Sequence, residues 1–329
     1  MRRRDVVTLA AGAATWPFAW LLAAEAQRQV GALINGTDNE PRSQSILRAF
    51  REGLARFGWV EGRNLRIDYR FSGNDPSRLA AYAKELVSLR PDVIFADTGP
   101  AARAVEQGTS VIPIVFVGGG DPTLTGLVRN IARPEGNMTG FANWFGSQGG
   151  RWLELFKEAV PRLTRVADIF FANAFSNESE LRASISAAGA ILGVTIIRMP
   201  VQNEVEMEHV ISAFAAERDG GVLLTGAGSS TALEAIERLA LYHHLPLMFG
   251  GAPIVTGREG FLMAHGPDFL DLARRASSYV DRILRGSKPS ELPVQYPTKF
   301  ELVVNLKTAK TIGVTIPETF LARADQVIE

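Results

Sequence analysis

Short apolar strand patterns alternate with amphipathic helix patterns along almost the whole chain after residue 27. The first strand pattern covers residues 28–36 and the next covers 65–71, with apolar residues at helical spacing over 45–57 between them. Such regular alternation is typical of parallel strands whose crossover helices cover both faces of a sheet. The sequence therefore predicts an α/β fold built from doubly wound parallel sheets.

The alternation restarts near residue 143, which divides the chain into two units of similar size. The first unit has further predicted strands at 91–97 and 112–117. The second unit has four predicted strands, at 164–171, 194–200, 220–226 and 245–250. Between the two units lies a glycine-containing segment at 138–150, which we interpret as the junction.

The elements after the second unit are too few to form a third domain. They comprise a strand pattern at 260–266, a helix at 267–286 and a strand at 299–305. We expect them to complete the first sheet and then the second, so that several strands form a hinge between two lobes. The predicted division is a first lobe of residues 27–142 plus 258–288 and a second lobe of residues 143–257 plus 289–329.

The first 26 residues have the three parts of an export signal. Arg2, Arg3 and Arg4 precede an apolar segment over 6–24, and Ala24-Glu25-Ala26 has the small-residue pattern of a cleavage site. The paired arginines and the modest hydrophobicity favour the twin-arginine route, with the Sec route as the alternative. We expect cleavage after Ala26 and a periplasmic mature protein; a retained membrane anchor is the alternative.

Composition argues against several classes of function. The chain has 35 basic and 35 acidic residues and no cysteine, so it lacks the basic surface of a nucleic-acid binder and any thiolate metal site or nucleophile. Four histidines occur, and no H-E-x-x-H, G-x-S-x-G or S-x-x-K motif accompanies them. We therefore expect no catalytic residue, no metal, no cofactor and no nucleic-acid partner.

Loops rich in glycine and threonine follow the predicted strands of the first unit. In open α/β sheets such loops carry the ligand, because helix N-termini and free amides lie there and can receive a carboxylate. The loop Gly118 to Pro122 could suggest a phosphate cradle, but Asp121 would place a negative charge against a phosphate. The loop at 223–234 has Thr231 where a dinucleotide motif has its third glycine, so phosphate binding is disfavoured there also.

Several stretches together resemble the ABC-transporter solute-binding proteins of the tryptophan-binding-protein-like family. The similarity runs over nearly the whole mature chain and is carried by FREGLARFGWVEGRNLRIDYR, IPIVFVGGGDPTLTGLV, RPEGNMTGF, RWLELFKEAVPRLTRVA and PTKFELVVNLKTAKTIGVTIPETFLARADQVIE. The resemblance implies a two-lobed periplasmic-binding-protein fold that captures an amino-acid-like solute between its lobes. It also implies delivery to an ABC permease in the inner membrane, and we expect a monomer.

We expect a set of residues at the cleft between the lobes, and the resemblance carries over those of the first lobe, at Gly36-Thr37, Thr98-Gly99, Gly120 to Pro122 and Gly140. We expect the amides of Thr98 and Gly99 to meet a ligand carboxylate and Asp121 to pair with an ammonium or to cap its own turn. Trp144 and Phe145 either stack on the ligand or pack the hinge. The complete predicted set is Gly36, Thr37, Thr98, Gly99, Gly120, Asp121, Gly140, Thr225, Gly226 and His265.

The second lobe departs from the family pattern at the positions where relatives carry an aromatic wall. The chain has Gly250-Gly251-Ala252-Pro253 where relatives often carry aromatic residues, and His265 replaces a tyrosine. Two other functions stay open: a ligand sensor of a signalling system, which the fold permits equally, and a secreted α/β enzyme, for which no nucleophile–base pair is evident.

Overall fold

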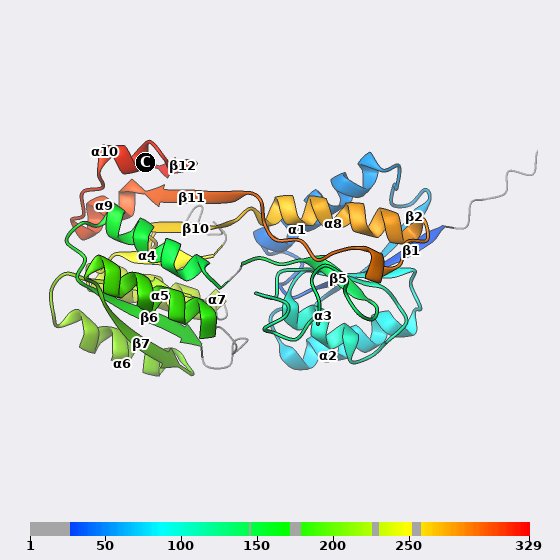
Figure 1. The fold of residues 1–329 in the computed structure, drawn as a ribbon, viewed down its shortest axis with the longest axis horizontal. Helices are drawn as coiled ribbons and strands as arrows, with labels where there is room; N and C mark the ends of the chain where they lie inside the picture. Colours follow the sequence, from blue (N-terminus) through cyan, green and yellow to red (C-terminus); the bar gives the residue numbers. More distant parts are fainter. Residues whose placement is uncertain (1–26, 145, 172–178, 226–229, 252–257) are drawn as a thin grey trace, which may run out of the picture.

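The computed structural model describes residues 27–144, 146–171, 179–225, 230–251 and 258–329. The predicted export signal, Phe145 and Gly226 therefore lie outside the described residues. No helix in the described ranges is both long and apolar enough to cross a membrane. The described elements form two lobes, each built on one sheet (Figure 1).

The first lobe contains a five-stranded sheet in the order β2-β1-β3-β4-β5, with every pair parallel. Its strands are β1 (Arg28–Ile34), β2 (Leu65–Phe71), β3 (Val93–Ala96), β4 (Ile114–Val117) and β5 (Met138–Phe141). Helices cover both faces, which explains why β3 and β4 are apolar and buried throughout.

Two helix pairs build the two cores of this lobe. Helices α1 (Pro41–Arg56) and α8 (Phe269–Leu284) pack on one face, where Phe50 stacks on Phe95 with ring centroids 4.2 Å apart. Helices α2 (Pro76–Ser88) and α3 (Gly99–Glu106) pack on the other face (Figure 1). Helix α8 is distant from α1 in sequence, so the first lobe is assembled from two separate segments.

The second lobe contains a seven-stranded sheet in the order β12-β11-β10-β9-β8-β6-β7. Its strands are β6 (Arg165–Phe171), β7 (Thr195–Val201), β8 (Gly220–Leu224), β9 (Leu247–Gly250), β10 (Met263–Pro267), β11 (Phe300–Asn305) and β12 (Gln326–Ile328). The pair β10–β11 is antiparallel and the other pairs are parallel.

Helices again cover both faces of this sheet. One face, called here the α4 face, carries α4 (Gln148–Ala159), α5 (Ser179–Leu192), α9 (Leu306–Ile312) and α10 (Glu318–Leu321). The opposite face carries α6 (Glu204–Ala215) and α7 (Ser230–Tyr242). The predicted α/β class with two doubly wound, mainly parallel sheets is thus confirmed.

Local signals in the sequence account for the helix boundaries. Asp75, Asn203 and Asp268 each accept a hydrogen bond from a backbone N–H in the first turn of the helix that follows. Helix α9 ends at Gly313, whose φ of 70° lies in the left-handed region that glycine adopts readily. The first three caps fix where a loop ends and a helix begins, and Gly313 fixes where α9 ends.

The structure differs from the sequence prediction at three places. Residues 138–141, predicted to belong to the junction between the units, form strand β5, so Gly140 is paired with Phe116 inside the sheet. Strand β10 belongs to the second sheet, although 258–288 was predicted for the first lobe. Leu292 conversely packs in the core of the first lobe, although 289–329 was predicted for the second. All three differences depend on contacts between segments that are distant in the sequence, and local sequence patterns do not predict such contacts. The other predicted boundaries remain a prediction.

Three connections join the lobes. The chain passes from β5 to α4, from β10 to α8, and from η1 (Pro289–Glu291) to β11. Two of them are tied together, because Asp268 N donates to the Lys299 carbonyl (3.1 Å) and Lys299 Nζ donates to the Asp268 carboxylate (2.8 Å). The multi-strand hinge predicted from the sequence is present.

Candidate functional site

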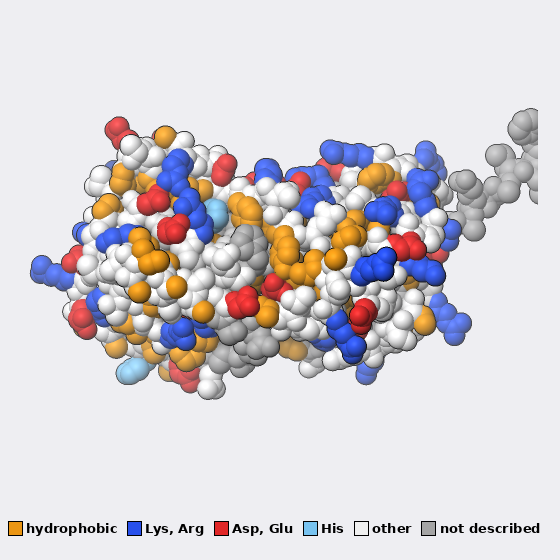
Figure 2. Space-filling view, viewed as in Figure 1, with side chains coloured by type: hydrophobic (Ala, Val, Ile, Leu, Met, Phe, Trp, Pro, Cys, Tyr) orange, Lys and Arg blue, Asp and Glu red, His pale blue; other side chains and the backbone are white. Residues whose placement is uncertain are grey.

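The carboxyl edges of the two sheets face each other. All strands of the first sheet run parallel, and the chain leaves for the second lobe from the carboxyl end of β5. Strand β10 runs parallel to β9, and from its carboxyl end the chain enters the first lobe at α8. Hydrophobic side chains gather on the surface in the middle of the molecule (Figure 2). The loops after β1, β3 and β4 therefore lie at the edge of the first sheet from which the chain leaves for the second lobe.

An ion pair organises the edge of the first lobe beside β1 and β3. Asp97 is fully buried and accepts from the Asn35 backbone N–H (2.8 Å) and from Arg42 Nη1 (2.9 Å). The Arg42 guanidinium also lies over the Phe269 ring, 5.5 Å from its centroid. Arg42 thus links α1 to the start of α8, immediately after an interlobe connection. Local sequence patterns do not predict this pair, because Arg42 and Asp97 are 55 residues apart.

Two predicted residues, Thr98 and Gly99, make structural contacts within the first lobe. Thr98 caps α3 through a hydrogen bond from the Ala101 N–H to Oγ1 (3.3 Å). A Cβ atom at Gly99 would lie 2.5 Å from the Cα of Gly119, so the two loops are in direct backbone contact. The loop after β4 therefore packs against the N-terminus of α3.

The turn after β4 has a backbone conformation that favours glycine at three successive positions. Gly118, Gly119 and Gly120 have φ angles of 93°, 88° and 71°, which residues with a Cβ rarely adopt. The Gly120 N–H donates to Asn143 Oδ1 (2.7 Å), and a Cβ at Gly120 would lie 3.2 Å from Trp144 Nε1. This turn thus meets the first interlobe connection.

Asp121 caps its own turn and holds a second connection. One carboxylate oxygen accepts from the Thr123 N–H (2.9 Å), the Thr123 hydroxyl (2.6 Å) and the Leu124 N–H (3.3 Å). The other accepts from the Tyr296 hydroxyl (2.8 Å). Burial alone would raise the pKa of Asp121, but these hydrogen bonds outweigh it and lower the pKa.

The remaining first-lobe residues of the predicted set occupy two different settings. Gly36 packs against the side chains of Glu40 and Ser43, which lie 2.2 and 2.5 Å from the position of a Cβ. Thr37 donates through its N–H to Glu40 Oε2 (3.2 Å). Gly140 lies in β5, where a Cβ would come within 2.2 Å of the Phe116 carbonyl oxygen. The first two line the loop after β1, whereas Gly140 serves close strand packing.

In the second lobe, Thr225 belongs to a buried polar group on the α4 face. Its hydroxyl donates to Asp168 Oδ1 (2.7 Å), and Arg182 Nη1 lies 3.2 Å from the other carboxylate oxygen. Burial raises the pKa of Asp168 although both partners favour its charged form. Thr225 thus anchors the end of β8 through its own lobe.

His265 points to the same α4 face. It follows Met263 by two residues and pairs with Leu302, both of which pack in the core under α4. Its ring stacks on Phe300 with centroids 5.7 Å apart. Burial and the positive charge of Arg151 lower its pKa to about 4 against an opposing effect of Asp325, so the imidazole is neutral at pH 7.

Two side chains of α4 complete this part of the second lobe. Trp152 is fully buried, lies against Gly250 of β9, and contacts Trp144 edge-on with ring centroids 6.3 Å apart. Trp144 therefore packs at the hinge, between Gly120 and Trp152. Gln148 precedes Trp152 by one helical turn and is 3% exposed. In the sequence, Gln148 and Trp152 resemble ordinary positions of an amphipathic helix, so no local pattern identifies them.

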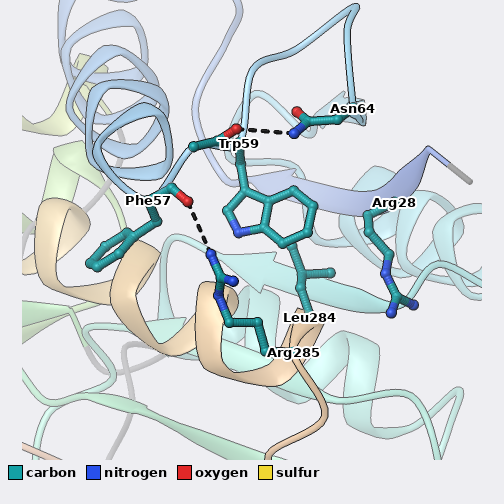
Figure 3. Close-up of a pocket in the computed structure, with 7 residues that line it drawn as sticks. Arg28, Phe57, Trp59, Asn64, Leu284 and Arg285 are labelled. Atoms are coloured by element: carbon teal, nitrogen blue, oxygen red, sulfur yellow. Dashed lines mark hydrogen bonds between the residues drawn. The ribbon is translucent and has the colours of Figure 1, made fainter. Parts of the chain in front are cut away.

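A surface depression occurs elsewhere, at the amino edge of the first sheet. Its volume is about 750 Å³, and Arg28, Trp59 and Arg285 contribute to its lining (Figure 3). Trp59 Nε1 donates to Asp281 (2.8 Å), and Arg285 donates to Asp281 (2.6 Å) and to the Phe57 carbonyl (3.1 Å). Because these groups are satisfied within the lobe, we do not assign a ligand site there.

The described side chains include no group of three or more histidines, aspartates or glutamates placed to hold a metal ion. A Ser–His contact does exist, between Ser212 Oγ and His243 Nε2 (3.2 Å), but it lies at the surface of the second lobe, between α6 and the end of α7. It is therefore remote from the facing edges. The described residues at the facing edges include glycine turns, helix caps and buried polar groups.

Proteins of known structure share this architecture. The chain is similar to an ABC domain in complex with L-Trp from Streptococcus pneumonia, with a TM-score of 0.80 and 23% identity over 92% of this chain and 100% of that one. It is also similar to a conserved domain protein from Vibrio cholerae, with a TM-score of 0.79 and 26% identity over 92% and 99% of the two chains. These likenesses match the two-lobed periplasmic-binding-protein fold.

Sequence comparison leads to a family. A tyrosine-binding protein from Clostridioides difficile is 22% identical over 286 residues, which are 87% of this chain and 81% of that protein. The family described as ABC transporter substrate binding protein matches residues 39–328. That match covers both lobes and all three connections. The chain therefore belongs to the ABC transporter substrate binding protein family.

Proposed function

We propose that this protein is the extracytoplasmic solute-binding component of an ABC importer. In this proposal it captures a small zwitterionic or carboxylate ligand, of the amino-acid type, in a cleft between its lobes. The mature monomer begins at Gln27, after removal of residues 1–26, and delivers the ligand to a permease in the inner membrane. Family membership supports the transport role.

The facing carboxyl edges carry this proposal. Both sheets direct their strand ends toward each other. Two of the three connections start from such ends, those of β5 and β10, and the third enters β11 beside the end of β10, its antiparallel partner. A ligand held there would contact both lobes, so closure of one lobe on the other would bury it. Two relatives support an amino-acid ligand, since one is named for tyrosine and another was solved with L-Trp.

The polar groups at the first-lobe edge refine the earlier expectation. Asp121 has protein partners for both carboxylate oxygens, so its first role is to hold the turn after β4. The Thr98 hydroxyl accepts the cap hydrogen bond from Ala101. We therefore propose that this edge supplies shape and backbone groups, and that side chains of the second lobe supply more of the polar recognition.

A thermal-shift screen of the mature protein tests the function. The panel contains L-amino acids, small organic acids and monosaccharides, because some structural neighbours with lower TM-scores are sugar-binding proteins. A ligand that binds only the native state raises the melting temperature, and we expect the largest rise with L-Trp or L-Tyr. If no amino acid or organic acid changes the melting temperature, the proposal is wrong. Recovery of a chemically altered ligand would instead indicate an enzyme.

A further inference from the structure

Buried polar atoms without partners concentrate at one place in the described structure. Six buried side-chain N or O atoms in the described residues lack a hydrogen-bond partner. Four of them belong to Gln148, Trp152 and His265, namely both amide atoms of Gln148, Trp152 Nε1 and His265 Nδ1. An unpaired buried polar atom is costly, so such a concentration indicates that something else satisfies these atoms.

The three side chains lie on the same face of the second sheet. Gln148 and Trp152 are four residues apart on α4 and hence on one side of the helix. Trp152 covers Gly250, where a Cβ would lie 2.5 Å from the indole ring. His265 pairs with Gly250 across the β9–β10 ladder, so its side chain points to the side on which Trp152 lies.

The cluster also lies at the edge that faces the first lobe. Helix α4 follows directly from the first interlobe connection, and Gln148 is its first residue. The Ser147 side chain makes no capping hydrogen bond, and no acidic residue occupies the first turn. The N-terminal end of a helix favours negative charge because its N–H groups point outward unpaired. Gln148, 3% exposed, lies unpartnered at this end.

The unpartnered atoms match a zwitterion. Trp152 Nε1 can only donate, and the Gln148 amide nitrogen is a donor as well, so both suit a carboxylate. Gln148 Oε1 can accept, and one nitrogen of a neutral imidazole can accept, so both suit an ammonium. Gly250, which has no side chain, lets the Trp152 ring pack directly on β9, so the position of the indole is fixed.

We propose that Gln148, Trp152 and His265, together with the N-terminus of α4, form the subsite of the second lobe that binds the carboxylate and ammonium of an amino-acid ligand. This inference rests on the proposed function and assigns the polar recognition to named residues. The aromatic part of the ligand then extends toward the glycine turn after β4 and Trp144. Binding at the hinge side of the cleft couples ligand contact directly to the β5–α4 connection.

Isothermal titration of the mature protein with L-Trp and L-Tyr tests the inference. The variants are Gln148→Leu and Trp152→Phe, which remove hydrogen-bonding atoms and keep most of the volume. Matched controls are Gln107→Leu, at an exposed position at the end of α3, and Trp59→Phe, at the amino edge of the first lobe. We expect each cluster variant to weaken binding by about ten- to hundredfold, because it removes hydrogen bonds to a charged group, and the controls to bind as the wild type does.

Ligand analogues sharpen the assignment. Tryptamine lacks the carboxylate, so we expect Gln148→Leu and Trp152→Phe to weaken its binding much less than that of L-Trp. Indole-3-propionate lacks the ammonium, and we expect its binding to be nearly indifferent to His265→Phe, which keeps the stack on Phe300. The melting temperature of each variant shows whether it folds. If Trp152→Phe does not fold, the affinity of Gln148→Leu, whose substitution lies at the helix terminus, tests the inference.

Three outcomes separate the possibilities. A selective loss of affinity for L-Trp or L-Tyr in the cluster variants supports the inference. Wild-type affinity in both cluster variants, with changes in melting temperature alone, would show that only internal water fills the cluster and would overturn the inference while leaving the proposed function intact. Failure of the wild-type protein to bind any amino acid overturns the proposed function and this inference with it.

Discussion

His265 is a buried titratable group whose charge state the fold controls. Removal from water and the nearby Arg151 guanidinium lower its pKa to about 4, whereas Asp325 acts in the opposite direction. In the unfolded chain a histidine titrates near pH 6.5. Between these values the unfolded chain binds more protons than the native state, so the free energy of unfolding decreases as the pH falls from about 6.5 toward 4.

The substitution His265→Gln removes this contribution to acid sensitivity. Between pH 7 and pH 4 we expect the wild type to lose about 3 kcal/mol more stability than the variant, the equivalent of the shift in pKa over that window. Urea unfolding followed at a series of pH values measures it. The control His209→Gln changes an exposed residue. Parallel pH profiles for the wild type and His265→Gln would contradict the prediction.

Asp121 and Tyr296 form a contact between the turn after β4 and the third connection. Asp121→Asn keeps the shape but weakens the cap and the bond from Tyr296, so we expect a loss of about 1 kcal/mol at pH 7. The pKa of Asp121 is lowered in the native state, so its carboxylate stabilises the wild type above about pH 3.8 and this stabilisation is lost as the pH falls below that value. The difference in free energy of unfolding between the wild type and Asp121→Asn should therefore shrink at low pH. Tyr296→Phe, which removes only one hydrogen bond, is the companion variant. A constant difference across pH would show that the charge plays no part.

At the scale of elements, the loops after β3 and β4 touch through glycines. The contact between Gly99 and Gly119 leaves no room for a side chain, because a Cβ at Gly99 would lie 2.5 Å from backbone. We expect Gly99→Ala to lower the free energy of unfolding by about 2 kcal/mol or more, since backbone must move. Thermal unfolding measures this. Gly108→Ala is the control, because its Cβ would meet neighbours at 3.3 Å or more. Equal stability of the two variants would contradict the argument.

Element types were largely predictable from the sequence, because periodicity and caps are local. Strand β2 was predicted at its observed bounds, 65–71. Strand β5 was missed, because four residues that include Thr139 and Gly140 resemble a turn. The sheet to which β10 belongs was also missed, since partner choice depends on segments far apart in the chain.

The candidate site was predictable only in part. The position of the loops at the strand ends follows from the topology. His265 was predicted as a site residue because it departs from the family pattern. Gln148 and Trp152, by contrast, occupy ordinary buried positions of a helix, and only the absence of partners in three dimensions distinguishes them. The role of Asp121 depended on Tyr296, which lies 175 residues away.

At the scale of the whole molecule, the three connections allow one lobe to rotate on the other without breaking either sheet. The chain has no cysteine, so two introduced cysteines can be labelled selectively. Exposed positions Arg63 in the first lobe and Val205 in the second suit fluorescence energy transfer. We expect transfer between them to change on addition of a ligand found in the thermal-shift screen, because closure reorients the lobes.

A pair within one lobe provides the control for this measurement. Arg63 and Val111 are both exposed and both belong to the first lobe. Their transfer should stay constant when ligand is added. A ligand that binds without any change in the interlobe pair would show that the lobes do not move on binding.

The return of α8 to the first lobe determines when this protein can fold. The core beside α1 includes Leu272, Tyr279 and Leu292, which a ribosome adds long after β1 to β5. The sheet of the second lobe is likewise incomplete until β11 and β12 have been synthesised. Neither lobe is complete until the end of synthesis is near, so the two mature almost together and the nascent chain carries no finished domain.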